Sequence, residues 1–193
     1  MQVNLFLYDD FETMDALSLA EIFGFAPDIF HVNYLSLLGD IVNSSHGTKI
    51  WTEHLVPEET SGIIVIPGGK GSRRLIQQPE VLKALRQAVD RASFCLSVGS
   101  GSVLLAKTGL LFHRNVVLRK PEKNWSRWVS SGVNWISDRK WIDDGKYYSA
   151  SDVLGNIDMA IDFIASQFDM DLANRIAEHI GYQWDPSKNG EFK

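Results

Sequence analysis

Residues 94–106 have the residue types and spacing of a turn at which many enzymes carry out chemistry. A short apolar run ends at Gly99-Ser100-Gly101-Ser102, and an apolar helical pattern follows. This pattern predicts a buried parallel strand, a tight turn and a helix. Such turns lie at the carboxyl edge of a sheet, where ligands bind, and their apex often holds a nucleophile. The apex here is Gly99, so the sequence predicts the turn without a nucleophilic side chain.

Hydroxyl and thiol groups flank this apex but do not occupy it. We expect the hydroxyls of Ser97, Ser100 and Ser102 to satisfy backbone groups or to cap the helix. Cys95 is the only cysteine and lies inside the predicted strand, which indicates an inert core residue. A single cysteine also excludes an internal disulfide and any metal site built from several cysteines.

Two phosphate-binding motifs are only partly matched. The run 99–104 has the first two glycines of a dinucleotide fingerprint but Leu104 in place of the third, so dinucleotide binding is an alternative hypothesis. The stretch 67–72 fails as a phosphate loop, because Gly71 follows Lys70 where serine or threonine is needed. Backbone N–H groups of Gly68 or Gly69 could face a pocket and hold an oxyanion. The alternative, a tight turn after a buried strand, is favoured by these residues alone.

Asp15 opens the first predicted helix, just past the first strand. Because parallel strands end at one edge of a sheet, we expect Asp15, Gly68 and Gly99 to converge there. A carboxylic acid at that edge could serve in acid–base chemistry, or it could complement the helix N-terminus.

The other acidic residues near Asp15 and the histidines of the chain give weaker indications of a functional site. We expect Asp9, Asp10 and Glu12 to be solvated. All five histidines are expected at the surface, with His113 the one nearest the pocket edge, and no pair has metal-ligand spacing on a helix.

Strand and helix patterns alternate along the chain. Strands are predicted at 3–8, 30–38, 62–66, 94–98, 116–118, 133–136, 140–142 and 147–149, with a small hairpin formed by 41–44 and 48–51. Helices are predicted at about 15–25, 79–92, 100–108, 124–131, 156–168 and 171–180. This order indicates an α/β fold, a flavodoxin-like three-layer sandwich whose mostly parallel central sheet has helices on both faces. Residues 1–193 are interpreted as one domain with a polar tail from about 185.

Composition narrows the classes of partner. The 193 residues carry a formal net charge of −5 and no cluster of lysines and arginines, which argues against nucleic acid. No apolar run approaches the roughly 20 residues of a membrane span, and the N-terminus lacks a signal-peptide pattern. We therefore expect a cytoplasmic protein without a membrane partner.

Several segments, in their order and spacing, resemble one known family. They are Leu5-Phe6-Leu7-Tyr8-Asp9-Asp10 with the residues that follow it to 16, and the segments 20–24, 65–71, 101–111, 149–151 and 157–160. Together they resemble the ThiJ/PfpI superfamily of the class I glutamine amidotransferase-like group. The branch with the greatest resemblance contains isocyanide hydratase and the amidase-like domains of some transcription regulators.

The resemblance implies a cysteine nucleophile at the turn, an acid bonded to it and backbone N–H donors beside it. Gly99 stands at the cysteine position, Ser100 follows it, and Asp15 retains the acid. Cys95 cannot replace the nucleophile, because it would have to move four residues, or about 13 Å along a strand.

Further departures surround the same pocket. Leu118-Arg119-Lys120 lies where relatives often have Thr-Thr-His or Thr-Asn-Lys, and two family glycines are replaced by Asp152 and Asn156. Glycine accepts an unfavourable backbone angle most easily, so the loss of the cysteine is expected to relax strain and to leave the fold intact.

These features predict a catalytically silent member of the family that binds a small polar or anionic molecule, with no cofactor or metal. The expected site residues are Asp15, Gly68, Gly69, Gly99, Ser100 and Arg119. The resemblance also implies a homodimer. One alternative is a hydratase, hydrolase or amidase in which Asp15 acts as general base on a water above Gly99. A second alternative is a nucleotide-binding flavodoxin-like module.

Overall fold

A computed structural model describes residues 1–119 and 123–185. The strands are β1 (Gln2–Phe6), β2 (His31–Ser36), β3 (Asp40–Asn43), β4 (Lys49–His54), β5 (Ile63–Ile66), β6 (Phe94–Val98), β7 (Asn115–Val117), β8 (Asn134–Ile136), β9 (Trp141–Asp144) and β10 (Tyr147–Ala150). The helices are α1 (Thr13–Gly24), η1 (Pro57–Glu59, a 3-10 turn), α2 (Ser72–Leu75), α3 (Pro79–Arg91), α4 (Ser100–Lys107), α5 (Lys123–Val129), α6 (Val153–Gln167) and α7 (Met170–His179).

The described strands form a main sheet in the order β3-β4-β2-β1-β5-β6-β10-β9, and β7 pairs with β8 in a separate small sheet. The pairs from β4 through β10 are parallel, whereas the edge strands β3 and β9 are antiparallel to their neighbours. Strand β5 consists of four fully buried branched residues, as expected for a strand covered on both faces. The prediction of a mostly parallel central sheet is confirmed.

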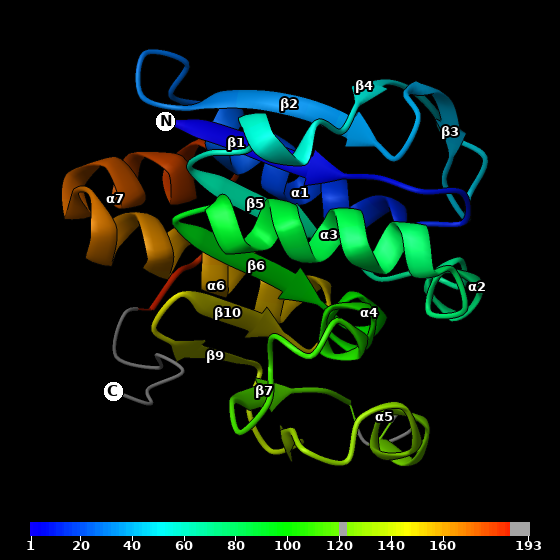
Figure 1. Cartoon of the computed structure of the whole chain (residues 1–193). Coiled ribbons are helices and arrows are strands. Elements are labelled where there is room, and N and C mark those ends of the chain that lie inside the picture. The colour runs from blue at the N-terminus through cyan, green and yellow to red at the C-terminus, as the bar shows by residue number, and fades with distance from the viewer. Residues whose placement is uncertain (120–122, 186–193) are drawn as a thin grey trace.

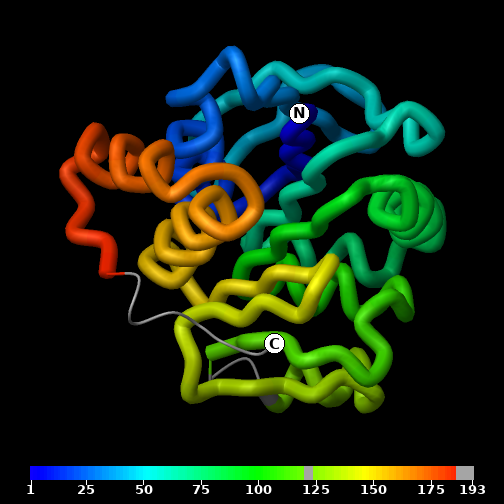
Figure 2. The backbone as a smooth tube through the Cα atoms, turned by 90° about the vertical axis from the view of Figure 1, so that its left-hand side faces the viewer, coloured from blue at the N-terminus to red at the C-terminus, as the bar shows by residue number. Residues whose placement is uncertain are grey.

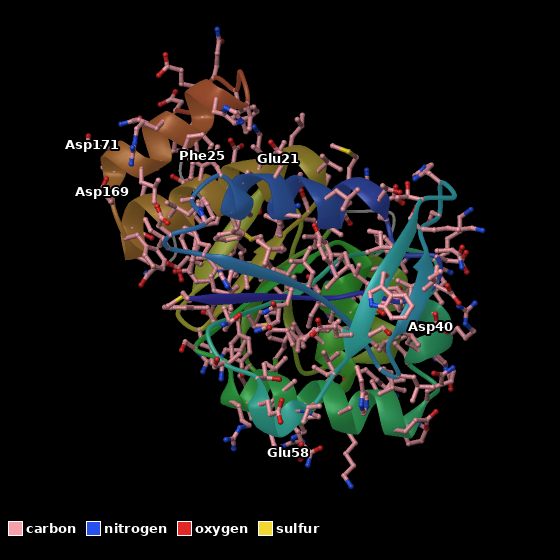
Figure 3. All side chains as sticks on the ribbon, turned by 90° about the horizontal axis from the view of Figure 1, so that it is seen from above. Glu21, Phe25, Asp40, Glu58, Asp169 and Asp171 are labelled. Carbon is pink, nitrogen blue, oxygen red and sulfur yellow. The ribbon has the colours of Figure 1, made fainter. Side chains whose placement is uncertain are left out.

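Helices cover both faces of this sheet, which completes the predicted flavodoxin-like sandwich. Helices α1, α6 and α7 pack against one another on one face, and α3 and α4 lie on the other (Figures 1 and 2). The small β7–β8 sheet and α5 lie beyond the β9 edge (Figure 1). Asp40 on β3 and Asp169 at the start of α7 lie at opposite ends of the molecule (Figure 3).

Most element boundaries agree with the predicted ranges, and the exceptions have local causes. The predicted hairpin exists, but β4 also pairs in parallel with β2 and thereby extends the main sheet. Helix α6 begins at Val153 and not at 156, because the Asp152 side chain accepts a hydrogen bond from the Gly155 amide and caps the first turn. The short helix α2 had no predicted counterpart.

Residues 186–193 of the predicted polar tail, and Lys120, lie outside the described residues. Within the part of the chain that the structure describes, no helix is both long and apolar enough to cross a membrane.

Candidate functional site

Four neighbouring strands place the predicted residues at one edge of the sheet. Strands β1, β5, β6 and β10 are adjacent and parallel, so their carboxyl ends point the same way. The chain leads from β1 to Asp15 on α1, from β5 to Gly68, from β6 to Gly99 and from β10 to Ser151. Strand β2 pairs with one side of β1, and β5, which comes later in the chain, pairs with the other side. The strand order thus reverses direction at β1, and α/β sheets bind ligands at the carboxyl edge beside such a switch point.

A cavity of about 400 Å³ lies at this edge. Its walls include every residue expected from the sequence: Asp15, Gly68, Gly69, Gly99, Ser100 and Arg119. Asp152, which the resemblance placed around the pocket, also lines it, and the sequence did not assign the remaining lining residues, which are Glu12, Lys70, Arg73, Ser151 and Val153. This volume is within the usual range for small-molecule sites.

Gly99 lies at the β6–α4 turn with a backbone conformation that side chains rarely adopt. Its φ is 49° and its ψ is −124°, and its amide donates to the Ala150 carbonyl at the end of β10. A Cβ atom on Gly99 would meet only the Ser151 carbonyl oxygen at 3.9 Å and Asp15 Oδ2 at 4.0 Å. Space for a side chain therefore remains open above Gly99, and the position is strained for any residue that has one.

Asp15 is almost fully buried, with 6% of its surface exposed. Its Oδ2 accepts a hydrogen bond from the Gly68 amide at 3.1 Å. Its main-chain oxygen accepts one from Asn156 Nδ2 at 3.1 Å, and the same amide group donates to Ser18 Oγ. Asn156 is buried and joins α6 to α1, and its side chain thereby holds the backbone of Asp15 in place.

The expected oxyanion donors of the loop after β5 are already engaged. The Gly68 amide donates to Asp15 Oδ2, and the Gly69 amide donates to Ser100 Oγ at 2.9 Å. The Ser100 hydroxyl in turn donates to the Gly69 carbonyl at 3.1 Å. In this structure side-chain acceptors from α1 and α4 bind both amides, and the hypothesis that they hold an oxyanion stays a prediction.

The glycines and serines of the turn have packing roles. A Cβ atom on Gly101 would come within 2.4 Å of the Ile66 carbonyl oxygen, so glycine permits the close approach of α4 to β5. The buried hydroxyls of Ser97 and Ser102 are hydrogen-bonded to each other at 2.9 Å. These contacts account for the glycine spacing that resembled a dinucleotide fingerprint. Ser97 Oγ also donates to the Tyr148 carbonyl and Ser100 Oγ to the Gly69 carbonyl, so these two serines satisfy backbone groups as predicted, whereas no side chain caps the first turn of α4.

Cys95 is a core residue, as predicted. It is fully buried in β6, and burial raises the pKa of its thiol far above the ordinary value. The thiolate that a nucleophile requires is therefore strongly disfavoured.

Three basic side chains border the cavity without acidic partners. Lys70 follows β5, Arg73 belongs to α2, and Arg119 follows β7. Among residues 1–119 and 123–185, none of them forms an ion pair. The Arg73 guanidinium lies 4.9 Å from the centre of the Trp125 ring, a cation–π contact that joins α2 to α5.

The acidic side chains of the cavity wall are, in contrast, held by the protein. Asp152 Oδ1 accepts from the Gly155 amide, and its Oδ2 accepts from the Ser151 hydroxyl at 3.0 Å. Glu12 Oε1 lies 3.3 Å from His46 Nδ1. The cavity wall therefore carries three basic and three acidic side chains, and the acidic ones differ from the basic ones in that they have polar partners within the protein.

Glu12 lines the cavity, where its amide donates to the Gly68 carbonyl and joins the two loops. Its side chain is solvated, as predicted, with 39% of its surface exposed. His113, which we expected nearest the pocket edge, is absent from the cavity wall, whereas His46 contacts the wall residue Glu12. His113 instead contacts the Phe112 ring. All five histidines are exposed, as predicted.

Metal ligands do not gather anywhere in the described residues. No group of three or more histidine, cysteine, aspartate and glutamate side chains in these ranges could hold an ion.

The chain is similar in sequence or in fold to several known proteins. It is 21% identical over 190 residues to the isonitrile hydratase of Pseudomonas putida. The matched region covers 94% of this chain and 78% of that protein. A ThiJ/PfpI family protein from Pseudomonas syringae shares the fold with a TM-score of 0.84 and 20% identity, over 97% of this chain and 77% of that one. An AraC family transcriptional regulator from Pseudomonas putida shares it with a TM-score of 0.77 and 17% identity, over 93% of this chain and 98% of that one. The family model that matches is that of the DJ-1/PfpI family, over residues 1–166.

Proposed function

The chain belongs to the DJ-1/PfpI family, and we propose that it is a non-catalytic member that binds a small anionic molecule in the cavity above Gly99. The observation that carries this proposal is the combination found at the β6–α4 turn. Gly99 has a backbone conformation that is strained for any residue with a side chain, and the side-chain space of a nucleophile turn is open above it, while the nucleophile itself is missing. The nearby cysteine cannot compensate, because Cys95 is buried in the strand.

Three exposed basic side chains in the cavity wall support an anionic ligand. Lys70, Arg73 and Arg119 have no ion-pair partner among the described residues, whereas the Asp152 oxygens accept hydrogen bonds from neighbouring groups. An arginine pair can bind a carboxylate or phosphate through several parallel N–H groups. A likeness to a transcription regulator agrees with a sensing role, in which a domain binds a metabolite without converting it.

Titration of small carboxylates and phosphates by calorimetry tests this proposal. We expect Arg119→Gln and Arg73→Gln each to weaken the binding of an anion by about tenfold, the effect of losing one charge-assisted hydrogen bond. Arg91→Gln is the matched control, because Arg91 is an exposed arginine at the end of α3, outside the cavity wall. Affinities that are the same in all the variants, or an absence of binding, would overturn the proposal.

A second candidate function follows from the similarity to isonitrile hydratase. Asp15 faces the open space above Gly99 and could act as general base on a water there, which would make the chain a hydratase or hydrolase without a covalent intermediate. This candidate predicts that Asp15→Ala abolishes the hydration of isocyanides while Cys95→Ser leaves it intact. Hydration that persists in Asp15→Ala would exclude it.

The expected homodimer remains part of the proposal and rests on the family resemblance. Sedimentation velocity at several protein concentrations measures the oligomeric state directly. A monomer at all concentrations would remove this part without affecting the proposed binding site.

A further inference from the structure

After α7 the chain returns to α6 in a short segment, residues 181–185, which we call the terminal strap (Figure 2). The chain leaves α7 through Gly181, whose φ of 66° turns it back. In this turn the Tyr182 amide donates to the Ala177 carbonyl at 2.8 Å. The Trp184 amide donates within the strap, to the Tyr182 carbonyl. These backbone bonds do not reach α6, so side chains must hold the strap there.

Two side-chain hydrogen bonds attach the strap to α6. The Tyr182 hydroxyl donates to Asp158 Oδ1 at 2.7 Å, and the Trp184 indole donates to Asp162 Oδ1 at 3.2 Å. Because the two acids are four residues apart, they lie one turn apart on the same face of the helix. Both aromatic side chains also pack against the hydrophobic core. The strap thus depends on two carboxyl groups of one helix.

The two acids differ in what neutralises them. Asp158 Oδ2 lies 3.3 Å from Lys140 Nζ, on the loop before β9. Asp162 is 6% exposed, and in the part of the chain that the structure describes it forms no ion pair. A buried carboxylate without a cation is costly, whereas a buried neutral acid that accepts a hydrogen bond is not. The contact with Asp162 is therefore the one that depends on its protonation.

The groups around Asp162 favour its neutral form. Burial raises the pKa of Asp162 to about 7; the hydrogen bond from the Trp184 indole opposes this shift, and the charge of Asp158 adds to it. Burial and Asp158 also raise the pKa of the Tyr182 hydroxyl to about 12, so this hydroxyl stays a donor near neutral pH. Asp185, the other acid of the strap, brings no positive charge.

Charged groups on the elements packed against α6 have partners of their own. Glu21 on α1 lies 3.7 Å from His179 on α7, as measured from Oε1 to Nε2. Asp144 on β9 lies 3.6 Å from the guanidinium of Arg114. On β10, burial raises the pKa of the Tyr148 hydroxyl, so it stays neutral. The strap contact with the greatest sensitivity between acidic and neutral pH is thus the one between Trp184 and the buried acid of α6.

We propose that the terminal strap is a pH-sensitive device, closed on α6 while Asp162 is protonated and opened as Asp162 ionises. Opening lets water solvate the carboxylate that Trp184 contacts in the closed state. It also withdraws Tyr182 from the wall of an apolar groove of about 260 Å³, which is lined mainly by α1 and α6. The inference is independent of the proposed anion site.

The direction of the effect follows from the two protonation states. The pKa of Asp162 is about 7 in the closed state, and in the open, solvated state we take the ordinary value of 3.8. Because the closed state has the higher pKa, it is favoured most below about pH 4, and this preference decreases as the pH rises to 7. The strap is therefore expected to close in acid and to open near neutral pH.

Exchange of the Trp184 indole hydrogen with water, followed by NMR, measures this opening in the full chain. The Trp184→Phe variant assigns the signal among those of the six tryptophans. We expect the protection factor, which is corrected for the intrinsic pH dependence of exchange, to fall at least about tenfold between pH 5 and pH 7.5. The amides of β5 report global unfolding, and the indole is expected to exchange faster than they do at pH 7.5.

Neutral variants identify the group responsible. Asp162→Asn keeps an acceptor oxygen and has no charge, so its indole protection at pH 7.5 is expected to match the wild-type value at pH 5. Asp162→Ser supplies a second neutral acceptor if the asparagine variant does not fold. Asp171→Asn removes an exposed acid at the start of α7 and is the matched control, with the wild-type decrease.

Three results would overturn the inference. The first is an indole protection factor in the wild type that does not change between the two pH values. The second is a decrease of the same size in the neutral variants, which would assign the effect to another group. The third is an indole that exchanges only as fast as the amides of β5, since the strap would then open only when the whole chain unfolds.

Discussion

Asp15 Oδ2 lies 4.0 Å from the position that a Cβ atom on Gly99 would occupy. The carboxylate on α1 and the turn after β6 thus face the same small volume, although 84 positions separate them in the chain. The Gly68 amide fixes the carboxylate from the third side at 3.1 Å. In the proposed assignment, Asp15 is the acid of the family site and Gly99 is the position that lacks the side chain it would contact.

The open space predicts that Gly99→Cys places an accessible thiol in the cavity. The wild-type chain is expected to resist thiol-labelling reagents, because its only cysteine, Cys95, is buried and burial raises the pKa of that thiol. Gly99→Cys should react with roughly one equivalent of reagent under native conditions. The Cys95→Ser, Gly99→Cys double variant identifies the reacting sulfur. A native Gly99→Cys chain that stays unlabelled would show that the cavity is closed.

The two glycines of the turn should differ in their tolerance of alanine. In Gly99→Ala the Cβ has room, and only the positive φ costs stability, about 1–3 kcal/mol. In Gly101→Ala the Cβ would lie 2.4 Å from the Ile66 oxygen and 2.5 Å from the Pro67 oxygen, both backbone atoms. We expect a loss of at least about 3 kcal/mol for this variant. Urea denaturation measures both, and a milder effect at Gly101 would contradict the close packing of α4 on β5.

How far the sequence could predict this site depends on the kind of signal. Asp15, Gly68 and Gly99 each follow a strand with a clear pattern, so their convergence at one sheet edge could be predicted from chain order alone. Arg73 could not, because α2 covers only Ser72–Leu75 and is too short to show helical periodicity. Its position in the wall became visible only in three dimensions.

The directions of side chains were the second feature of the site that the sequence could not predict. Whether the Gly68 and Gly69 amides face a ligand depends on where the Asp15 carboxylate and the Ser100 hydroxyl point. Residue patterns contain no information about these rotamers, so the oxyanion hypothesis could not be decided from the sequence. The place of Glu12 in the cavity wall could not be predicted for a related reason, since a backbone hydrogen bond to Gly68 draws its segment to the cavity.

Asp152 should contribute to stability as a helix cap. Its Oδ1 accepts from the Gly155 amide in the first turn of α6. Asp152→Ala is expected to lower the free energy of unfolding by about 1 kcal/mol, while Asp152→Asn, which retains an acceptor oxygen, should cost less. Thermal or urea denaturation provides the comparison. Equal losses in the two variants would mean that the carboxylate charge matters and the cap does not.

The buried acid Asp162 on α6 should make stability depend on pH. Burial raises the pKa of Asp162 to about 7, although the Trp184 indole donates to its Oδ1 at 3.2 Å. Because the folded pKa lies above the ordinary value of 3.8, Asp162 stabilises the fold at low pH, and this contribution decreases as the pH rises toward 7.

Asp162→Asn tests this dependence. The neutral side chain keeps an acceptor for Trp184 and removes the cost of a buried charge. We expect the variant to match the wild type near pH 4 and to be more stable at pH 8, as measured by urea denaturation at a series of pH values. If the free energies of unfolding of the wild type and the variant change with pH in parallel, Asp162 is not the cause of the pH dependence.

The central claim, that the cavity binds without catalysis, is tested most directly by assaying turnover. The purified chain is incubated with isocyanides, glyoxals and small amides, beside Asp15→Asn and Cys95→Ser. The account predicts that the wild type and both variants give rates equal to the buffer alone. Robust turnover by the wild type that Asp15→Asn abolishes would contradict it and would establish Asp15 as the catalytic base.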